Sequence, residues 1–375
     1  MLKNLNPVWD LDSIFPGGSS SPQLDAHLRQ VAADIESLQA LIPAGADREQ
    51  WRQFIDKNQD VAARLRQAGA FIGCLDAQNT KDKKAKLLAG RVRQLYAALS
   101  SVQAAVDEKI LAMDDGTWAE LLETPELKPI AFSLEEMRQR AREKMSADQE
   151  RLANDLAVDG YHGWSELYNT VTGRMEIAWE QDGKTELLSV GQFANLFSHP
   201  DAAVRAKAGR LWEEAWEQEE DLCAGALNHL AGFRLNLYKH RGWDSFLKEP
   251  LDVNRMQAET LDVMWGVVED NKDIFVKYLD RKRQLLNLEK LTWYDVGAPV
   301  GKVNRTYTFD EAANFVVEQL RRVSPRMADF VVSALQKRWV EAENRGNKRA
   351  GAFCTSFPVS KETRVFMTFA GTPDN

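Results

Sequence analysis

The sequence predicts a mainly α-helical protein, a large multi-helix body in two lobes with a β-hairpin and a small C-terminal β-sheet. Three observations predict this class. Apolar residues recur every three or four positions through most of the chain, as in amphipathic helices. Strand-like patterns of alternating or β-branched residues occur only at about 174–188 and 350–370. The 375 residues, 44% of them hydrophobic, suffice for two lobes with a packed core.

Residues 1–115 are predicted to form an N-terminal lobe of long antiparallel helices. An apolar arm precedes them and must dock on the body to bury Trp9 and Phe15. The first helix begins after Ser21, with Pro22 at the first helical position, where the missing N–H costs nothing. The second and third helices are expected at about 47–70 and 81–113.

Residues 116–375 are predicted to continue as a helical body. Ser133, Ser146 and Thr308 each start a capping-box pattern, which indicates a helix start. Asp182–Gly183 is a strong type I′ turn, so a hairpin is expected at about 174–188. Further helices are expected at about 155–173, 189–197, 200–241, 257–286 and 308–323, and from residue 324 onwards.

The strongest β signal lies at the C-terminal end of the sequence. Two runs rich in aromatic and β-branched residues, 350–357 and 363–370, flank Pro358 and predict adjacent strands. The chain then ends in Thr-Pro-Asp-Asn, a composition typical of a turn and a helix start. We therefore expect the sequence to end just before its chemistry begins.

Composition excludes some classes of partner. The net charge of −8 argues against nucleic acid as the main partner. Three cysteines, odd in number and far apart, are typical of reduced thiols in a cytosolic protein. The N-terminus lacks an apolar run of signal-peptide length, and no segment approaches the ~20 apolar residues of a membrane span. We expect a cytoplasmic protein without a membrane partner.

A search for catalytic motifs finds no complete constellation. None of the five histidines is four residues from another, so the helical zinc pair His-x-x-x-His is missing. The sequence contains no Walker A loop, no G-x-G-x-x-G after a strand and no G-x-S-x-G elbow. Cys354 has no basic neighbour in the sequence that would make it a nucleophile. We assign no catalytic residue and no metal ligand to this chain.

Four stretches in the same order resemble the oligoendopeptidase F family of zinc metallopeptidases, which is thimet-oligopeptidase-like. The similarity covers essentially the whole chain as the N-terminal and central part of such an enzyme. The stretches are Trp9-Asp10-Leu11 with Ile14-Phe15-Pro16, Asn228 to Leu251, Leu291 to Pro299, and Gly346 to Phe353.

The resemblance implies a zincin-type peptidase scaffold, with zinc as cofactor, that hydrolyses short peptides in a deep channel. In this family a helix bearing His-Glu-x-x-His follows the counterpart of the last residues, so the zinc ligands are expected downstream of Asn375. The chain would then supply channel walls and a docking strand, and by itself be inactive. The alternatives are a non-catalytic helical binding or scaffold protein, or one half of a split peptidase.

The resemblance also implies a role for the terminal strands, because such peptidases hold a peptide as an extra strand on a sheet edge. Alternatively, these strands only pack under the body. We further expect short peptides and a missing C-terminal part as partners, with self-association through an apolar surface around Phe366, Phe369 and Trp339. The predicted substrate-binding residues are Gly351, Ala352, Phe353, Phe369, Ala370, Gly371 and Thr372.

Overall fold

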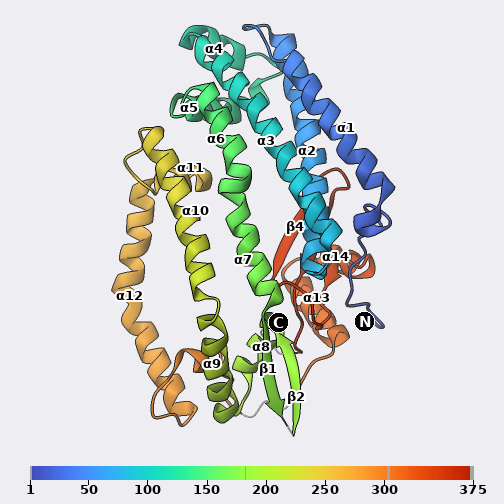
Figure 1. Ribbon diagram of the computed structural model, residues 1–375, viewed down its shortest axis with the longest axis vertical. Coiled ribbons are helices and arrows are strands. Elements are labelled where there is room, and N and C mark those ends of the chain that lie inside the picture. Colours follow the sequence, from blue (N-terminus) through green and yellow to red (C-terminus); the bar gives the residue numbers. More distant parts are fainter. Residues whose placement is uncertain (1, 182, 302–304, 372–375) are drawn as a thin grey trace.

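Three long helices pack side by side at one flank of the computed structural model, which describes residues 2–181, 183–301 and 305–371 (Figure 1). Each begins at a polar residue, Ser21, Asp47 or Asp82, whose side chain accepts hydrogen bonds from the first free N–H groups. The predicted N-terminal helices are thus confirmed. The helices, with the short 3-10 turn η1 (Gly18–Ser20) before them, are α1 (Pro22–Ala40), α2 (Arg48–Gln78) and α3 (Lys83–Ala112).

Helix α2 continues to Gln78, beyond the predicted end near residue 70, because Phe71, Ile72 and Leu75 extend its apolar face into the core. The N-terminal arm packs on this bundle as predicted. Trp9 and Phe15 are buried, and the Phe15 ring lies 5.1 Å from that of Phe71.

The main hydrophobic core joins the N-terminal helices to the C-terminal sheet. Phe357 and Phe366 from the terminal strands lie in the same buried cluster as the apolar faces of α1, α2 and α3. The two ends of the sequence therefore fold against each other. The division into lobes near residue 115 stays a prediction.

The next segment runs back along the bundle. Ser146 forms the predicted capping box with Gln149, and the helical path breaks at Tyr161, directly after Gly160. The capping box predicted at Ser133 is wrong, because a 3-10 turn leads straight into a helix that has already begun at Ala131. The elements are α4 (Asp115–Leu122), η2 (Lys128–Ile130), α5 (Ala131–Arg142), α6 (Ala147–Gly160) and α7 (His162–Arg174).

The predicted hairpin is confirmed as the antiparallel pair β1 (Glu176–Gln181) and β2 (Lys184–Ser189). Trp179 packs on Phe193 from the following turn of helix. That turn consists of α8 (Val190–Ala194) and η3 (Asn195–Ser198).

The single long helix predicted over 200–241 is wrong, because two helices meet at a bend. The first packs against the hairpin and the second against α7, so one straight axis could not serve both. Leu222 and Leu227, on the second of these helices, are exposed. The remaining helical elements are α9 (Ala202–Glu217), α10 (Glu220–His240), α11 (Lys248–Asn254), α12 (Ala258–Leu285), η4 (Trp293–Asp295), α13 (Phe309–Val323) and α14 (Pro325–Gln336).

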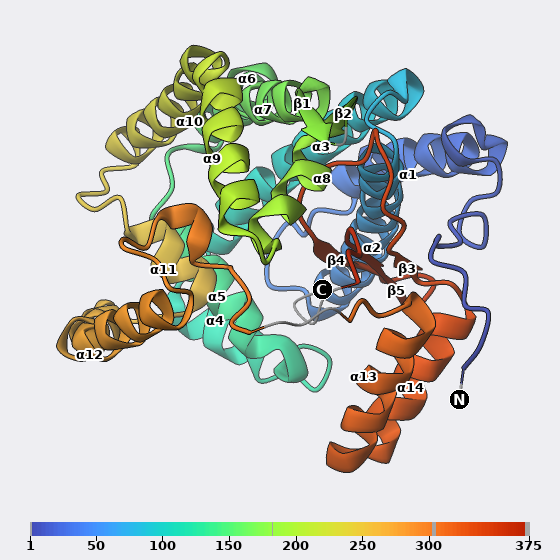
Figure 2. The same ribbon diagram turned by 90° about the horizontal axis from the view of Figure 1, so that it is seen from below.

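Helix α12 stands apart from the bundle, and α13 and α14 project together from the sheet (Figure 2). All 28 residues of α12 are described, and only Lys282 among them is buried. Across the described ranges, no helix is both long and apolar enough for a bilayer crossing.

The apolar surface predicted around Phe366, Phe369 and Trp339 is wrong at two of its residues, because Phe366 and Trp339 are buried, whereas Phe369 is half-buried. Self-association stays a prediction. Phe366 packs on Trp9 and Phe353, and the Trp339 ring lies against Phe330. Exposed large apolar side chains instead gather on α12, α13 and α14.

The terminal sheet has three strands in the order β3-β5-β4, with β5 in the centre. The two predicted strands exist but are shorter, since Gly351 adopts a φ of +88° before the first and regular pairing of the second ends at Phe366. The third strand was not predicted, because it is only two residues long. The strands are β3 (Val340–Glu341), β4 (Phe353–Phe357) and β5 (Glu362–Phe366).

Candidate functional site

The β3 edge of the terminal sheet is covered by the chain's own N-terminal arm. The Asp10 N–H donates to the Arg338 carbonyl at 2.7 Å, and the Ala342 N–H donates to the Pro7 carbonyl at 2.6 Å. Arg364, fully buried on β5, fixes the arm by donating to the Asp10 carbonyl and the Ser13 hydroxyl. This edge has no room for another strand.

The β4 edge carries peptide groups that face away from the sheet. The Val365 N–H donates to the carbonyl of Trp339, directly before β3, and the Met367 N–H donates to the Glu341 carbonyl in β3. Because peptide groups alternate in direction along a strand, those of Arg364 and Phe366 face β4. Arg364 pairs with Thr355. The peptide groups of Cys354 and Ser356, one residue to either side, therefore point outward. Among the described residues, no segment outside the sheet forms a backbone bond with them.

Three of the predicted site residues lie at the start of β4. Gly351, with its positive φ, has no other group within 4 Å of the position that a Cβ would take, and Ala352 is exposed. Phe353 instead turns its ring into the core, stacked on Phe366 at 5.1 Å. Gly351 and Ala352 leave the approach to the free edge open, whereas the ring of Phe353 does not face it.

The other predicted residues lie on the opposite side of β5. The Phe369 N–H donates to the Ala342 carbonyl, and its ring packs on Phe309. Ala370 follows, and then Gly371, where a Cβ would come within 2.9 Å of the Tyr307 carbonyl oxygen. The close approach at Gly371 is thus one of this chain's own backbone. Thr372 lies outside the described residues.

Lys348 holds the loop before β4 against the sheet. Its ammonium donates to the Glu343 carbonyl at 2.7 Å and the Met367 carbonyl at 2.8 Å, and lies 3.2 Å from the buried Glu341 carboxylate. Burial lowers the pKa of Lys348, and Glu341 opposes that shift. The sequence stretch Gly346 to Phe353 contains this residue, but its partners are distant in the chain and so could not be inferred.

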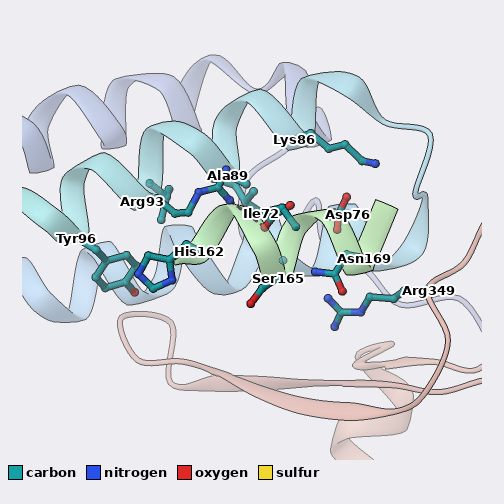
Figure 3. Close-up of a pocket in the computed structure, with 14 residues that line it drawn as sticks. Ile72, Asp76, Lys86, Ala89, Arg93, Tyr96, His162, Ser165, Asn169 and Arg349 are labelled. Atoms are coloured by element: carbon teal, nitrogen blue, oxygen red, sulfur yellow. Dashed lines mark hydrogen bonds and ion pairs between the residues drawn. The ribbon is translucent and has the colours of Figure 1, made fainter. Parts of the chain in front are cut away.

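A cavity of about 330 Å³ adjoins the start of β4, between α2, α3 and α7 (Figure 3). Arg349 connects the cavity to β4. Its backbone N–H donates to the Ala77 carbonyl of α2 at 2.9 Å, and its guanidinium lies 4.8 Å from the centre of the Phe353 ring on β4. The cavity could not be predicted from the sequence, because three helices and a loop each contribute only a few residues to it.

The cavity contains both acidic and basic groups. Arg93 and Glu166 form an ion pair across it at 2.9 Å. Burial, followed by the charge of Arg93, lowers the pKa of His162. Burial also raises the pKa of Asp76, whose Oδ1 is buried without a hydrogen-bond partner.

The described residues do not fit a zinc site. No three of their His, Cys, Asp and Glu side chains come together as a set of metal ligands. Cys354 is exposed, and its Sγ lies 3.7 Å from the Thr363 hydroxyl. We therefore derive no chemical step through a metal here.

Comparison with known proteins agrees with this architecture. A family model described as oligopeptidase F matches residues 109–177. The chain is 22% identical over 365 residues to the group B oligopeptidase PepB of Streptococcus agalactiae, covering 96% of this chain and 59% of that protein. The chain is thus similar to the oligoendopeptidase F family. It is also 20% identical to the oligopeptidase PepF of Bacillus subtilis, covering 92% of this chain and 52% of that protein.

Solved structures similar to this chain share its fold. The oligoendopeptidase F of Enterococcus faecium matches with a TM-score of 0.69 and 18% identity over 84% of this chain and 66% of that one. A PZ peptidase A bound to an inhibitor matches with a TM-score of 0.67 and 18% identity, over 94% of this chain and 60% of that one. The chain spans about three fifths of the length of these relatives.

Proposed function

We propose that this chain forms the peptide-docking part of a zinc-dependent oligopeptidase, with the free edge of β4 as the docking strand. The observation that carries the proposal is the outward direction of the Cys354 and Ser356 peptide groups. The other edge of the sheet is already occupied by the N-terminal arm. The relatives' names, oligopeptidase and oligoendopeptidase F, support a short peptide as the ligand.

A short extended peptide would add to the sheet beside β4. Cys354 and Ser356 would each donate one N–H and accept one N–H from it. Each such bond contributes about 0.5–1.5 kcal/mol net. Because it involves only the peptide backbone, peptides of different sequence would bind in the same way. Gly351 and Ala352 would lie beside the peptide, with Phe353 supporting the strand from the core. Phe369, Ala370, Gly371 and Thr372 are proposed contacts for peptide that extends past the sheet.

Peptide hydrolysis is not assigned to residues of this chain. We propose that the zinc ligands lie in the part of the relatives' length that this chain does not span. Zinc bound there would supply a Lewis acid and an activated water. The role of β4 is to fix the peptide, which removes much of the entropic cost of reaching the reactive geometry. A fluorogenic peptide mixed with this chain and zinc is expected to stay intact; cleavage that a chelator stops would contradict this.

The docking edge is tested by Ser356→Pro. Proline lacks the outward N–H, and an edge position tolerates it because that N–H does not pair with β5. Binding of a short, fluorescently labelled peptide, measured by anisotropy, is expected to weaken at least about tenfold, because the substitution removes one bond and obstructs its neighbours.

Ser356→Ala is the matched control, since it removes the hydroxyl but keeps the backbone N–H, and its peptide affinity should equal that of the parent chain. Equal affinity of Ser356→Pro and Ser356→Ala, with both folded by circular dichroism, would rule out β4 as the docking edge. Peptide binding without cleavage, even when the part of the relatives that this chain does not span is supplied as a second chain, would favour a non-catalytic binding protein. Cleavage restored by that second chain would favour a split peptidase.

A further inference from the structure

We propose that the cavity between α2, α3 and α7 binds a small zwitterion of the amino-acid or dipeptide type, with both its ammonium and its carboxylate free. This inference goes beyond the docking edge, because it uses none of the β4 peptide groups. It rests on three charged side chains that converge on one cavity and, among the described residues, form no ion pair or side-chain hydrogen bond.

Among the described residues, three charged side chains at the cavity form no ion pair. Asp76 Oδ1 is buried and accepts no hydrogen bond. Lys86 and Arg349 line the same cavity, and among the described residues neither side chain forms an ion pair or a hydrogen bond. The Arg349 guanidinium lies over the Phe353 ring, and the charges of both residues act on Asp76. Buried polar atoms in folded proteins are nearly always satisfied by protein, water or a ligand, so an unpartnered carboxylate oxygen beside a cavity leaves a place for a donor group.

The charges select the class of ligand. Arg93 and Glu166 neutralise each other in their ion pair, which leaves one acidic and two basic groups. A simple anion such as phosphate would bind Lys86 and Arg349 but place like charge beside Asp76. A simple amine would satisfy Asp76 and be repelled by the two cations. A zwitterion offers an ammonium to Asp76 and a carboxylate to Arg349, which can bind it with two parallel hydrogen bonds.

The arrangement of the lining supports a ligand with a polar head and a side chain. Figure 3 shows Asp76, Asn169 and Arg349 together at one end of the cavity. Tyr96 and His162 lie at the other end, where a ring or an apolar side chain could pack on them. The ligand's charged head is therefore assigned to the first end and its side chain to the second.

The size of the cavity limits the ligand. Its volume of about 330 Å³ falls at the lower end of the range for small-molecule sites, roughly 300–1,000 Å³. Gly73 lines the cavity from α2, and no other group lies within 4 Å of the position that its Cβ would take. A residue with a long side chain at position 73 would therefore fill the space that the ligand needs.

The test is calorimetric titration of the full chain with the dipeptide Gly-Phe, its N-acetylated form, its C-terminal amide and inorganic phosphate. Gly-Phe is expected to bind saturably, and each blocked form at least about tenfold more weakly. Asp76→Asn should remove the preference for the free ammonium, and Arg349→Gln the preference for the free carboxylate. Each variant should thus lose the preference for one free end of the dipeptide and keep the preference for the other. A folding defect would remove both.

Gly73→Leu should abolish binding by filling the cavity while leaving the helix intact, and Lys83→Gln, an exposed change outside the cavity on α3, should leave the affinity unchanged. Equal binding of free and blocked dipeptides, phosphate binding as tight as that of Gly-Phe, or no saturable binding at millimolar concentration would each overturn the proposal. Ser356→Pro is expected to retain Gly-Phe binding, so failure of the docking edge and failure of this cavity are distinguishable.

Discussion

Helices α3 and α12 are of nearly equal length, 30 and 28 residues, and both have an apolar face, yet their surroundings differ completely. On α3, Val102 and Ile110 are fully buried against the neighbouring helices. On α12, Trp265 is 61% exposed and Phe275 is 62% exposed. An amphipathic pattern thus determines that a helix forms, whereas its neighbours determine whether the apolar face is covered.

The difference follows from how each helix is held. Helix α3 lies among α1, α2, α5 and α6. Helix α12 is tied down near its C-terminal end, where Lys282 donates to the Val296 carbonyl and Arg283 to the Leu288 carbonyl. Equal substitutions in the bundle and on α12 should therefore have unequal effects on the free energy of unfolding.

The largest contrast is expected between Phe71→Ala in α2 and Phe275→Ala in α12. Phe71 is fully buried against Phe15, so its truncation should leave a cavity and destabilise the protein by about 3–5 kcal/mol. Phe275 is mostly exposed, so the same change should alter stability by no more than about 0.5 kcal/mol. Urea unfolding measures both, and a loss of several kcal/mol at Phe275 would mean that α12 packs more closely than described.

Two glycines extend the comparison, because a Gly→Ala substitution should lower the free energy of unfolding in a packed helix and raise it in the exposed helix α12. A Cβ on Gly209 of α9 would come within 2.4 Å of the Tyr294 ring, so Gly209→Ala should destabilise by about 1–3 kcal/mol. A Cβ on Gly266 of α12 meets nothing within 4 Å, so Gly266→Ala should stabilise by about 0.5–1 kcal/mol through helix propensity. Thermal melts of the two variants should shift in opposite directions; a shared direction would contradict the contrast.

The free energy of unfolding should also depend on pH through the Asp34 carboxylate in the bundle. Burial acts to raise the pKa of Asp34, but hydrogen bonds from Lys57 and Arg64 outweigh it and lower the pKa to about 2. Because the folded pKa lies below the unfolded value, the stabilisation is complete above about pH 4 and is lost as the pH falls towards 2. Asp34→Asn should cost about 1–2 kcal/mol at neutral pH, and its difference from the parent should become small near pH 2 and vanish below it.

Lys57→Gln is the graded control, since it leaves Arg64 beside Asp34 and should show a smaller loss over the same pH range. Urea unfolding at a series of pH values measures the free energy of unfolding of the parent, Asp34→Asn and Lys57→Gln, so that their dependence on pH can be compared. A constant difference between Asp34→Asn and the parent down to pH 2 would show that Asp34 does not act through its charge.

The sequence predicted the parts of the candidate site that depend on local pattern. The two terminal strands follow from β-branched and aromatic residues around Pro358, and Gly351 does lie at the start of β4. The free edge could not be predicted, because it depends on β3 and the arm covering the other side of β5. The cavity was equally hidden, since Asp76 and Arg349 are far apart in sequence and meet only through the packing of α2 against the loop before β4.

By itself the sequence determined the helices, their caps at Ser21, Ser146 and Thr308, and the hairpin, because hydrogen bonds and side-chain period within a few residues fix these elements. Only the tertiary structure decided where the chain bends between α9 and α10, which apolar faces are buried, and which strand edge is left open. Those outcomes depend on contacts between distant segments, and a local pattern carries no information on which distant segment arrives beside it.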